Sequence, residues 1–163
     1  MLITLFAALL LTAPAQASIS LREQLRPLQL LVGSCWTGTF PGGTSTDTHC
    51  FEPVFGGAFV RDRHIVRGGK TPYEGETIYA WDAGRKQVVY TYWASDGGFS
   101  TGTMETAEGA LVFPESHERD GRIVKMQNVW TITGKDSYDV VVSQWKDGRW
   151  AEMWKMTMRR DAR

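Results

Sequence analysis

The fold of this chain is decided by one stretch, which reads Thr77-Ile78-Tyr79-Ala80-Trp81-Asp82-Ala83-Gly84-Arg85-Lys86-Gln87-Val88-Val89-Tyr90-Thr91-Tyr92-Trp93. Two runs rich in β-branched and aromatic residues, 77–81 and 88–93, flank the turn sequence Asp82-Ala83-Gly84. Such runs on either side of a short turn predict two antiparallel strands joined as a hairpin. The same alternation of run and turn continues along the chain, so we expect a protein built mainly of strands.

Turn sequences punctuate the chain at short intervals on both sides of this stretch. They are Gly42-Gly43, Gly56-Gly57, Gly68-Gly69, Asp82-Ala83-Gly84, Asp96-Gly97-Gly98, Glu108-Gly109, Asp120-Gly121, Gly134-Lys135-Asp136 and Asp147-Gly148. Nine turn signals predict about ten short antiparallel strands. No helical segment of crossover length separates two of them, which excludes parallel pairing and predicts an up-and-down order.

One short helix is expected before the strands. Helical periodicity is confined to residues 21–31, where leucines recur, Ser20 is a suitable N-cap and Pro27 limits the length. A meander of about ten strands must then split into a sandwich or close on itself, and closure removes the exposed edges. We therefore predict an all-β, closed up-and-down antiparallel barrel, lipocalin-like, as a single domain over residues 18–163.

The side chains expected inside this barrel follow from alternation along the late strands. On the last strand, Trp150, Glu152, Trp154, Met156 and Met158 share one face, which we take as the inward face. The preceding strands contribute inward rows that also carry a lone polar residue among apolar ones. A mostly apolar pocket with a few polar groups is typical of small-molecule sites. The residues predicted to bind a ligand are Met126, Asn128, Trp130, Gln144, Trp150, Glu152, Trp154 and Met156.

The alternative is an ordinary core with hydrogen-bonded polar groups near a barrel end, because alternation of side chains does not measure cavity volume. In the third to sixth strands the pattern does not even decide which face is inward. Tyr79 and Trp81 lie opposite Ile78 and Ala80, and neither side is clearly polar.

Residues 1–17 read as a secretory signal peptide. An apolar run over residues 2–11 precedes the small-x-small triplet Ala15-Gln16-Ala17, which is typical of a cleavage site. The run is roughly half of the 20 or so residues that a membrane span needs, so no membrane span is expected. We predict that the mature protein begins at Ser18 and is periplasmic or secreted.

The two cysteines, Cys35 and Cys50, flank a turn-forming stretch over residues 41–45. If Phe40 pairs with Ser45, the same register places Cys35 directly opposite Cys50, close enough for a disulfide. The oxidising compartment expected after export would close that bond. The alternative is a pair of free buried thiols, because the register depends on an assumed turn.

The charge and the hydrophobic content of the chain exclude some classes of function. The chain of 163 residues carries 18 Lys and Arg against 18 Asp and Glu, so its formal net charge is zero. A nucleic-acid binder is expected to show a basic face or tail, and we predict no nucleic-acid partner. With 42% hydrophobic and 12% aromatic residues, the chain has enough apolar surface to fold.

Three segments resemble a known family: Leu31-Val32-Gly33-Ser34-Cys35-Trp36-Thr37-Gly38, Phe55-Gly56-Gly57-Ala58-Phe59 and Tyr73-Glu74-Gly75-Glu76-Thr77-Ile78-Tyr79-Ala80-Trp81-Asp82. They are similar to bacterial secreted proteins of unknown function with a lipocalin-like, calycin-type barrel. The resemblance implies a barrel and a pocket but no particular ligand. It also implies that Trp36 packs over the closed end of the barrel. Nitrobindin-type barrels, a looser relative, hold haem through a histidine.

The three histidines, His49, His64 and His117, lie far apart in the sequence and lack metal-ligand spacing. We interpret them as isolated surface or hydrogen-bonded residues and expect no metal and no cofactor. Haem is the alternative, because it needs only one axial histidine and a barrel can gather distant residues.

The sequence thus favours a secreted barrel that binds a small apolar or amphipathic molecule. One alternative is a barrel enzyme on a small substrate, with Glu152 or His64 as the acid or base, although we expect no catalytic residue. The other is a structural or protein-interaction component of the cell envelope that uses Trp93 or Trp145 as an anchor. The ligand and the oligomeric state are not encoded in any pattern found.

Overall fold

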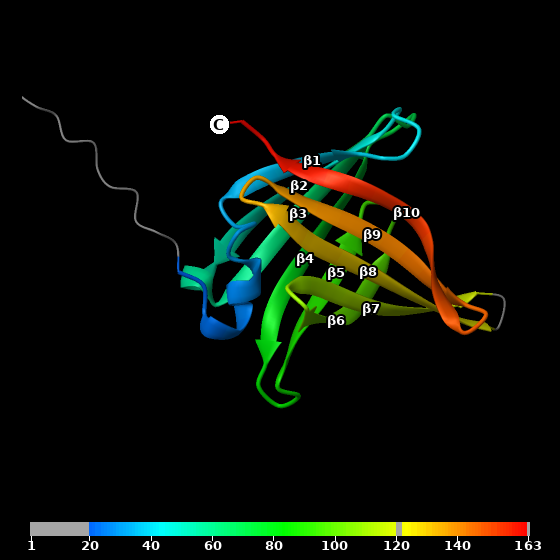
Figure 1. Cartoon of the computed structure of the whole chain (residues 1–163). Helices are drawn as coiled ribbons and strands as arrows, with labels where there is room; N and C mark the ends of the chain where they lie inside the picture. The colour runs from blue at the N-terminus through cyan, green and yellow to red at the C-terminus, as the bar shows by residue number, and fades with distance from the viewer. Residues whose placement is uncertain (1–19, 120–121, 163) are drawn as a thin grey trace, which may run out of the picture.

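The computed structural model describes residues 20–119 and 122–162. Within them, ten strands form one closed antiparallel barrel in which each strand pairs with its sequence neighbours and the last strand pairs with the first (Figure 1). The strands are β1 (Ser34–Thr39), β2 (Thr46–Val54), β3 (Phe59–Arg67), β4 (Tyr73–Asp82), β5 (Gln87–Ala94), β6 (Phe99–Ala107), β7 (Ala110–Arg119), β8 (Arg122–Gly134), β9 (Ser137–Lys146) and β10 (Arg149–Arg160). The all-β fold and the closed up-and-down topology predicted from the sequence are confirmed.

The expected N-terminal helix is a short 3-10 helix, η1, over Glu23–Leu28. Its N-cap is Arg22 rather than Ser20, and no side chain caps it. Pro27 lies inside it and has no N–H to donate, which disfavours a regular α-helix. Burial holds the segment in place instead, through four leucines that are almost completely buried: Leu21, Leu25, Leu28 and Leu31.

The two ends of the barrel differ in what covers them. Because successive strands run in opposite directions, the β1–β2, β3–β4, β5–β6, β7–β8 and β9–β10 connections share one end, which we call the hairpin end. The remaining connections share the other end with η1, seen in blue in Figure 1, and we call it the η1 end. A second 3-10 helix, η2 (Phe55–Gly57), lies there between β2 and β3.

Trp36 closes the η1 end, as the resemblance implied. Its side chain is fully buried, and its indole Nε1 donates to the carbonyl oxygen of Leu31 at 3.0 Å. The Arg160 guanidinium lies 4.2 Å from the centre of the indole ring, and Tyr138 contacts the ring edge on with the centroids 5.4 Å apart. A cation over a buried tryptophan and a leucine-rich 3-10 helix together seal this end.

The predicted pairing of β1 with β2 is confirmed. Cys35 lies opposite Cys50, the Phe40 N–H donates to the Ser45 carbonyl oxygen at 2.9 Å, and the two cysteines form a disulfide. The bond links two adjacent strands at the point where the sheet closes.

The inward rows of β8 and β9 agree with the predicted alternation. Asn128 pairs with Val142 and Trp130 pairs with Val140, so these residues share one face of the sheet. Trp130, Val140 and Val142 are buried, which identifies that face as the inward one.

The expectation of unbroken alternation along β10 is wrong. The register between β9 and β10 shifts between Glu152 and Trp154. Trp154 pairs with the inward Val142, whereas Glu152 pairs with Ser143 on the opposite face. An extra residue in one strand of an antiparallel pair reverses the side of every side chain beyond it.

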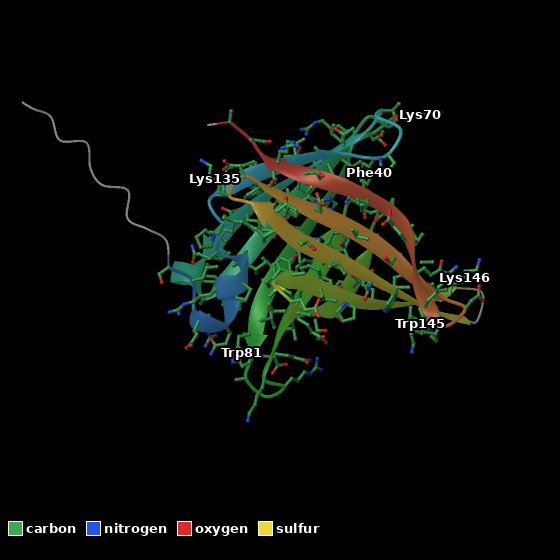
Figure 2. All side chains as sticks on the ribbon, viewed as in Figure 1. Phe40, Lys70, Trp81, Lys135, Trp145 and Lys146 are labelled. Atoms are coloured by element: carbon green, nitrogen blue, oxygen red, sulfur yellow. A yellow bond between two sulfur atoms is a disulfide. The ribbon has the colours of Figure 1, made fainter. Side chains whose placement is uncertain are left out.

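This bulge turns two of the residues expected inside toward the outside. Trp150 pairs with Trp145, and the two rings pack edge to face with centroids 5.2 Å apart while each side chain is 40% or more exposed. Figure 2 labels Trp145 and Lys146 beside the turn between β9 and β10. Glu152 is exposed on the same outer face.

The predicted signal peptide, residues 1–17, lies outside the described residues. Within the part of the chain that the structure covers, we find no helix with the length and apolar character that crossing a membrane requires.

Candidate functional site

The barrel encloses a cavity of about 400 Å³. Phe40, at the β1–β2 turn, and Tyr73, at the start of β4, line it at the hairpin end. At its other end it is lined by Tyr138, whose ring contacts Trp36. Its aromatic walls come from six strands and one turn: Phe40, Tyr79, Tyr90, Phe113, Trp130, Tyr138 and Trp154. Such a volume falls within the range typical of small-molecule pockets, about 300–1,000 Å³.

One wall of the cavity is polar, and two neighbouring strands build most of it. The sequence Asp-x-His occurs in β2 at Asp47-Thr48-His49 and again in β3 at Asp62-Arg63-His64. Residues two apart on a strand share a face, so each motif turns both side chains inward. The pairing of β2 with β3 places His49 directly opposite His64, and their rings stack with centroids 4.9 Å apart.

Hydrogen bonds join these side chains into one network, which we call the polar cluster and define as Asp47, His49, Asp62, His64, Tyr73 and Tyr92. His49 contacts Asp47 through Nε2 at 3.1 Å and Asp62 through Nδ1 at 2.8 Å. His64 contacts the other oxygen of Asp47 through Nδ1 at 3.1 Å and the Tyr92 hydroxyl through Nε2, also at 3.1 Å. The Tyr92 hydroxyl lies 2.7 Å from that of Tyr73.

The cluster concentrates charge inside the barrel. Burial opposes protonation of His49, but the carboxylates of Asp62 and Asp47 outweigh that effect and raise its pKa to about 10. Burial also opposes ionisation of Asp47, yet hydrogen bonds from His49 and His64 hold its pKa far below 3.8. His49 and Asp47 therefore form an ion pair at neutral pH.

Two polar atoms near the cavity have no hydrogen-bond partner among the described residues. They are Oδ1 of Asp62 and the hydroxyl oxygen of Tyr138, and both are buried. Both residues line the cavity. Because a buried polar atom without a partner costs about 1–3 kcal/mol, such atoms are suited to contact a bound polar group.

Gly75 on β4 makes room for the cluster. A Cβ atom at this position would collide with the imidazole of His64 and with the ring and hydroxyl of Tyr92. Glycine therefore permits the close approach that brings these two side chains together.

The residues predicted to bind a ligand divide into two sets. Asn128, Trp130, Trp154 and Met156 line the cavity, and the Trp130 indole Nε1 donates to the Asn128 Oδ1 at 3.0 Å.

The other four predicted residues do not line the cavity. Met126 packs against the core and pairs across the sheet with Gln144. The bulge in β10 places Trp150 and Glu152 on the outer face, as described above.

Sequence reasoning missed most of the polar cluster. The sequence pattern predicts that His49 and His64 are isolated surface or hydrogen-bonded residues, with His64 also a candidate acid or base, whereas the barrel stacks the two imidazoles against each other. The repeated Asp-x-His motif was the signal that could have found the cluster. Its use required the register between β2 and β3, which depends on the geometry of η2. The side chain of His117 lies outside the described part of the structure.

In comparisons with known proteins, no protein-family model and no curated protein matches the chain. The resemblance to bacterial secreted barrels thus stays a prediction.

Proposed function

We propose that this protein binds a small amphipathic molecule inside its barrel. The observation that carries the proposal is a cavity of about 400 Å³ with aromatic walls and one polar side. Burying apolar ligand surface against the aromatic residues supplies the driving force, at about 25 cal/mol per Å². The polar cluster then fixes the orientation of the ligand's polar end.

The chemistry of the polar side favours a ligand that carries hydrogen-bond donors. Asp62 Oδ1 accepts hydrogen bonds only and has no partner within the described protein, while the Tyr138 hydroxyl can donate or accept. A polar end with hydroxyl or amino groups would satisfy these atoms. A purely apolar ligand would leave both buried without partners, which disfavours it.

We also propose that the protein acts after export, in the periplasm or outside the cell. The disulfide supports this, because disulfides persist in oxidising compartments and are rare in the cytosol. The test is the N-terminal sequence of protein recovered from the periplasm or the medium. A start at Ser18 supports export with cleavage, whereas an intact N-terminus found only in the cytosol contradicts it.

The binding proposal is tested by native mass spectrometry of protein gently purified from its own host, with uptake of the apolar dye N-phenylnaphthylamine measured in parallel. Val140→Phe places a larger side chain in the cavity, whereas Val141→Phe, the matched control, changes the neighbouring residue on the opposite face of β9. We expect Val140→Phe to abolish dye uptake and Val141→Phe to retain it. The proposal fails if the wild-type protein carries no non-covalent adduct and takes up no dye.

A second candidate function is acid–base catalysis by His64. Its imidazole lies in the cavity between Asp47 and the Tyr92 hydroxyl, an arrangement that can orient a histidine for proton transfer. Glu152, the other candidate acid or base, lies on the outer face. The catalytic reading predicts that the molecule recovered by native mass spectrometry is converted on incubation, and that His64→Gln stops conversion but retains binding.

A further inference from the structure

We propose that the polar cluster is a binding site for one divalent transition-metal ion, held by Asp47, His49 and His64. This site goes beyond the proposed binding of an organic molecule and needs no such molecule to form. Three observations support it. The metal-ligating atoms of three side chains lie close together, each histidine has a hydrogen-bond partner on its other ring nitrogen, and two carboxylates are buried beside them.

The three side chains already converge. One metal-ligating atom from each of Asp47, His49 and His64 lies within 4.8 Å of the other two. His49 Nε2 and His64 Nδ1 each lie 3.1 Å from an oxygen of Asp47. In a tetrahedral zinc site with bonds of about 2.0–2.1 Å, neighbouring ligand atoms are about 3.3 Å apart. The two imidazoles contact different oxygens of Asp47, so a metal ion would replace these hydrogen bonds and draw the three ligand atoms together from within 4.8 Å.

The far side of each imidazole carries the kind of partner that metal-bound histidines have. Such a histidine almost always donates its other ring N–H to a carboxylate, a carbonyl or another oxygen. His49 has Asp62 on Nδ1 at 2.8 Å, and His64 has the Tyr92 hydroxyl on Nε2 at 3.1 Å. These contacts would fix the ring tautomers so that the nitrogens facing Asp47 are free to bind the metal.

The charge of the cluster also suits a cation. Asp47 and Asp62 are 6% and 2% exposed, so two carboxylates lie together inside the barrel. Protonated His49 is the cation between them, and Asp62 Oδ1 still has no partner among the described residues. A divalent ion bound here would displace the proton of His49 and would bring two positive charges to the two carboxylates.

The donor set indicates the class of metal. Two imidazole nitrogens and one carboxylate oxygen suit zinc and related first-row ions, whereas Mg²⁺ and Ca²⁺ prefer oxygen ligands throughout. Three protein ligands leave at least one coordination position, and His49, His64 and Asp47 all line the cavity. That position is therefore directed toward the space where a small molecule would bind.

The test is titration of the exported, chelator-treated protein, without a histidine tag, with Zn²⁺ and with Co²⁺. We expect one ion per chain, and with Co²⁺ a visible absorption band from a site of low coordination number. His49→Gln and His64→Gln should lose this stoichiometric binding, while the control Glu152→Gln, which changes an exposed metal-ligating residue type on the outer face, keeps it. Asp62→Asn, which alters only the outer partner of His49, should weaken binding about 10- to 100-fold.

X-ray absorption at the zinc edge of the wild-type protein does not depend on whether any variant folds. It should show two imidazoles and additional oxygen ligands. The proposal is overturned if the wild-type protein binds no ion stoichiometrically, if its spectrum lacks imidazole, or if folded His49→Gln and His64→Gln proteins bind as the wild type does. Dye uptake is measured separately, so loss of metal binding with dye uptake retained contradicts this site alone.

Discussion

At the scale of single residues, the packing of the polar cluster against the inward face of β4 requires a residue without a side chain. Gly75 lies against the His64 imidazole and the Tyr92 ring, which reach the cluster from β3 and β5. Any larger residue would push these side chains apart and break the contact between His64 Nε2 and the Tyr92 hydroxyl. The polar cluster thus depends on a residue that contributes no chemical group to it.

Gly75→Ala is expected to lower the free energy of unfolding by about 1–3 kcal/mol, because the added methyl group overpacks a closely packed interior. Urea unfolding followed by circular dichroism measures this change. Gly69→Ala is the matched control, since a Cβ there meets only the Thr71 carbonyl oxygen at 3.5 Å, an ordinary contact. Equal stability of the two variants would contradict the close packing at Gly75.

Two tyrosine hydroxyls in the cavity wall should respond in opposite ways to removal. The Tyr138 hydroxyl is buried without a partner, so Tyr138→Phe should raise the free energy of unfolding of ligand-free protein by about 1 kcal/mol. The Tyr92 hydroxyl contacts both His64 and Tyr73, so Tyr92→Phe should lower it by about 1–3 kcal/mol. Urea unfolding of both variants provides the comparison, and a loss of stability in Tyr138→Phe would show that its hydroxyl has a partner.

At the scale of elements, the β1–β2 hairpin is linked both covalently and by polar contacts. The disulfide joins Cys35 to Cys50, and two residues further along the same pair of strands the Thr37 and Thr48 hydroxyls lie 2.9 Å apart. Since β1 also pairs with β10, this hairpin belongs to the seam where the barrel closes. Its stability therefore affects closure of the whole sheet.

Replacing both cysteines with alanine should lower the free energy of unfolding by about 3 kcal/mol, because the unfolded chain then gains the freedom of a loop closed over 15 residues. Thr37→Ala combined with Thr48→Ala is the matched control on the same hairpin and should cost about 0.2–1 kcal/mol. Guanidinium unfolding compares the two. A similar small loss in both double variants would mean that the disulfide adds little to the native hairpin.

The bulge in β10 changes which of its side chains face the solvent at the hairpin end of the barrel. The side chains of Glu152 and Trp150, which precede the bulge in the sequence, therefore point outward. On the outer face Trp150 packs against Trp145. A second exposed aromatic pair, Trp93 with Phe99, flanks the β5–β6 connection at the same hairpin end. These are the side chains on which the alternative role in protein interaction would depend.

At the scale of the whole molecule, enclosure changes how the tyrosines titrate. Burial raises the pKa of Tyr79 and Tyr138 well above 10.0, and burial together with the nearby Glu115 raises that of Tyr90 to about 12. Closing the barrel therefore keeps these phenols protonated.

Stability should consequently fall on the alkaline side. The contribution of these tyrosines to the free energy of unfolding is fully present below a pH of about 10. It is lost as the pH rises from there through the pKa values of the folded state, because the tyrosines of the unfolded chain release their protons first. Near-ultraviolet absorbance of tyrosinate, followed together with circular dichroism, should show Tyr79 and Tyr138 ionising only as the barrel unfolds. Ionisation of all five tyrosines with the ordinary pKa of about 10 in a folded protein would contradict their burial.

The sequence by itself predicted the class of fold and about ten antiparallel strands, and, with an assumed turn at residues 41–45, the pairing of Cys35 with Cys50. These depend on local signals, namely turn residues and alternation within a strand, which act over a few residues. The inward rows of β8 and β9 could be predicted for the same reason. The 3-10 form of η1 and the face of Trp150 could not, because packing of leucines and one extra residue in a strand override local periodicity.

Only the tertiary structure decided the polar cluster. Asp47 and His49 share a face by alternation, as do Asp62 and His64, but their meeting requires the register between β2 and β3. The approach of Tyr92 to His64 further requires that β4 carries no side chain at Gly75. Such long-range positions are fixed by closure of the barrel, in which each strand's register is set by all the others and by no single segment of the sequence.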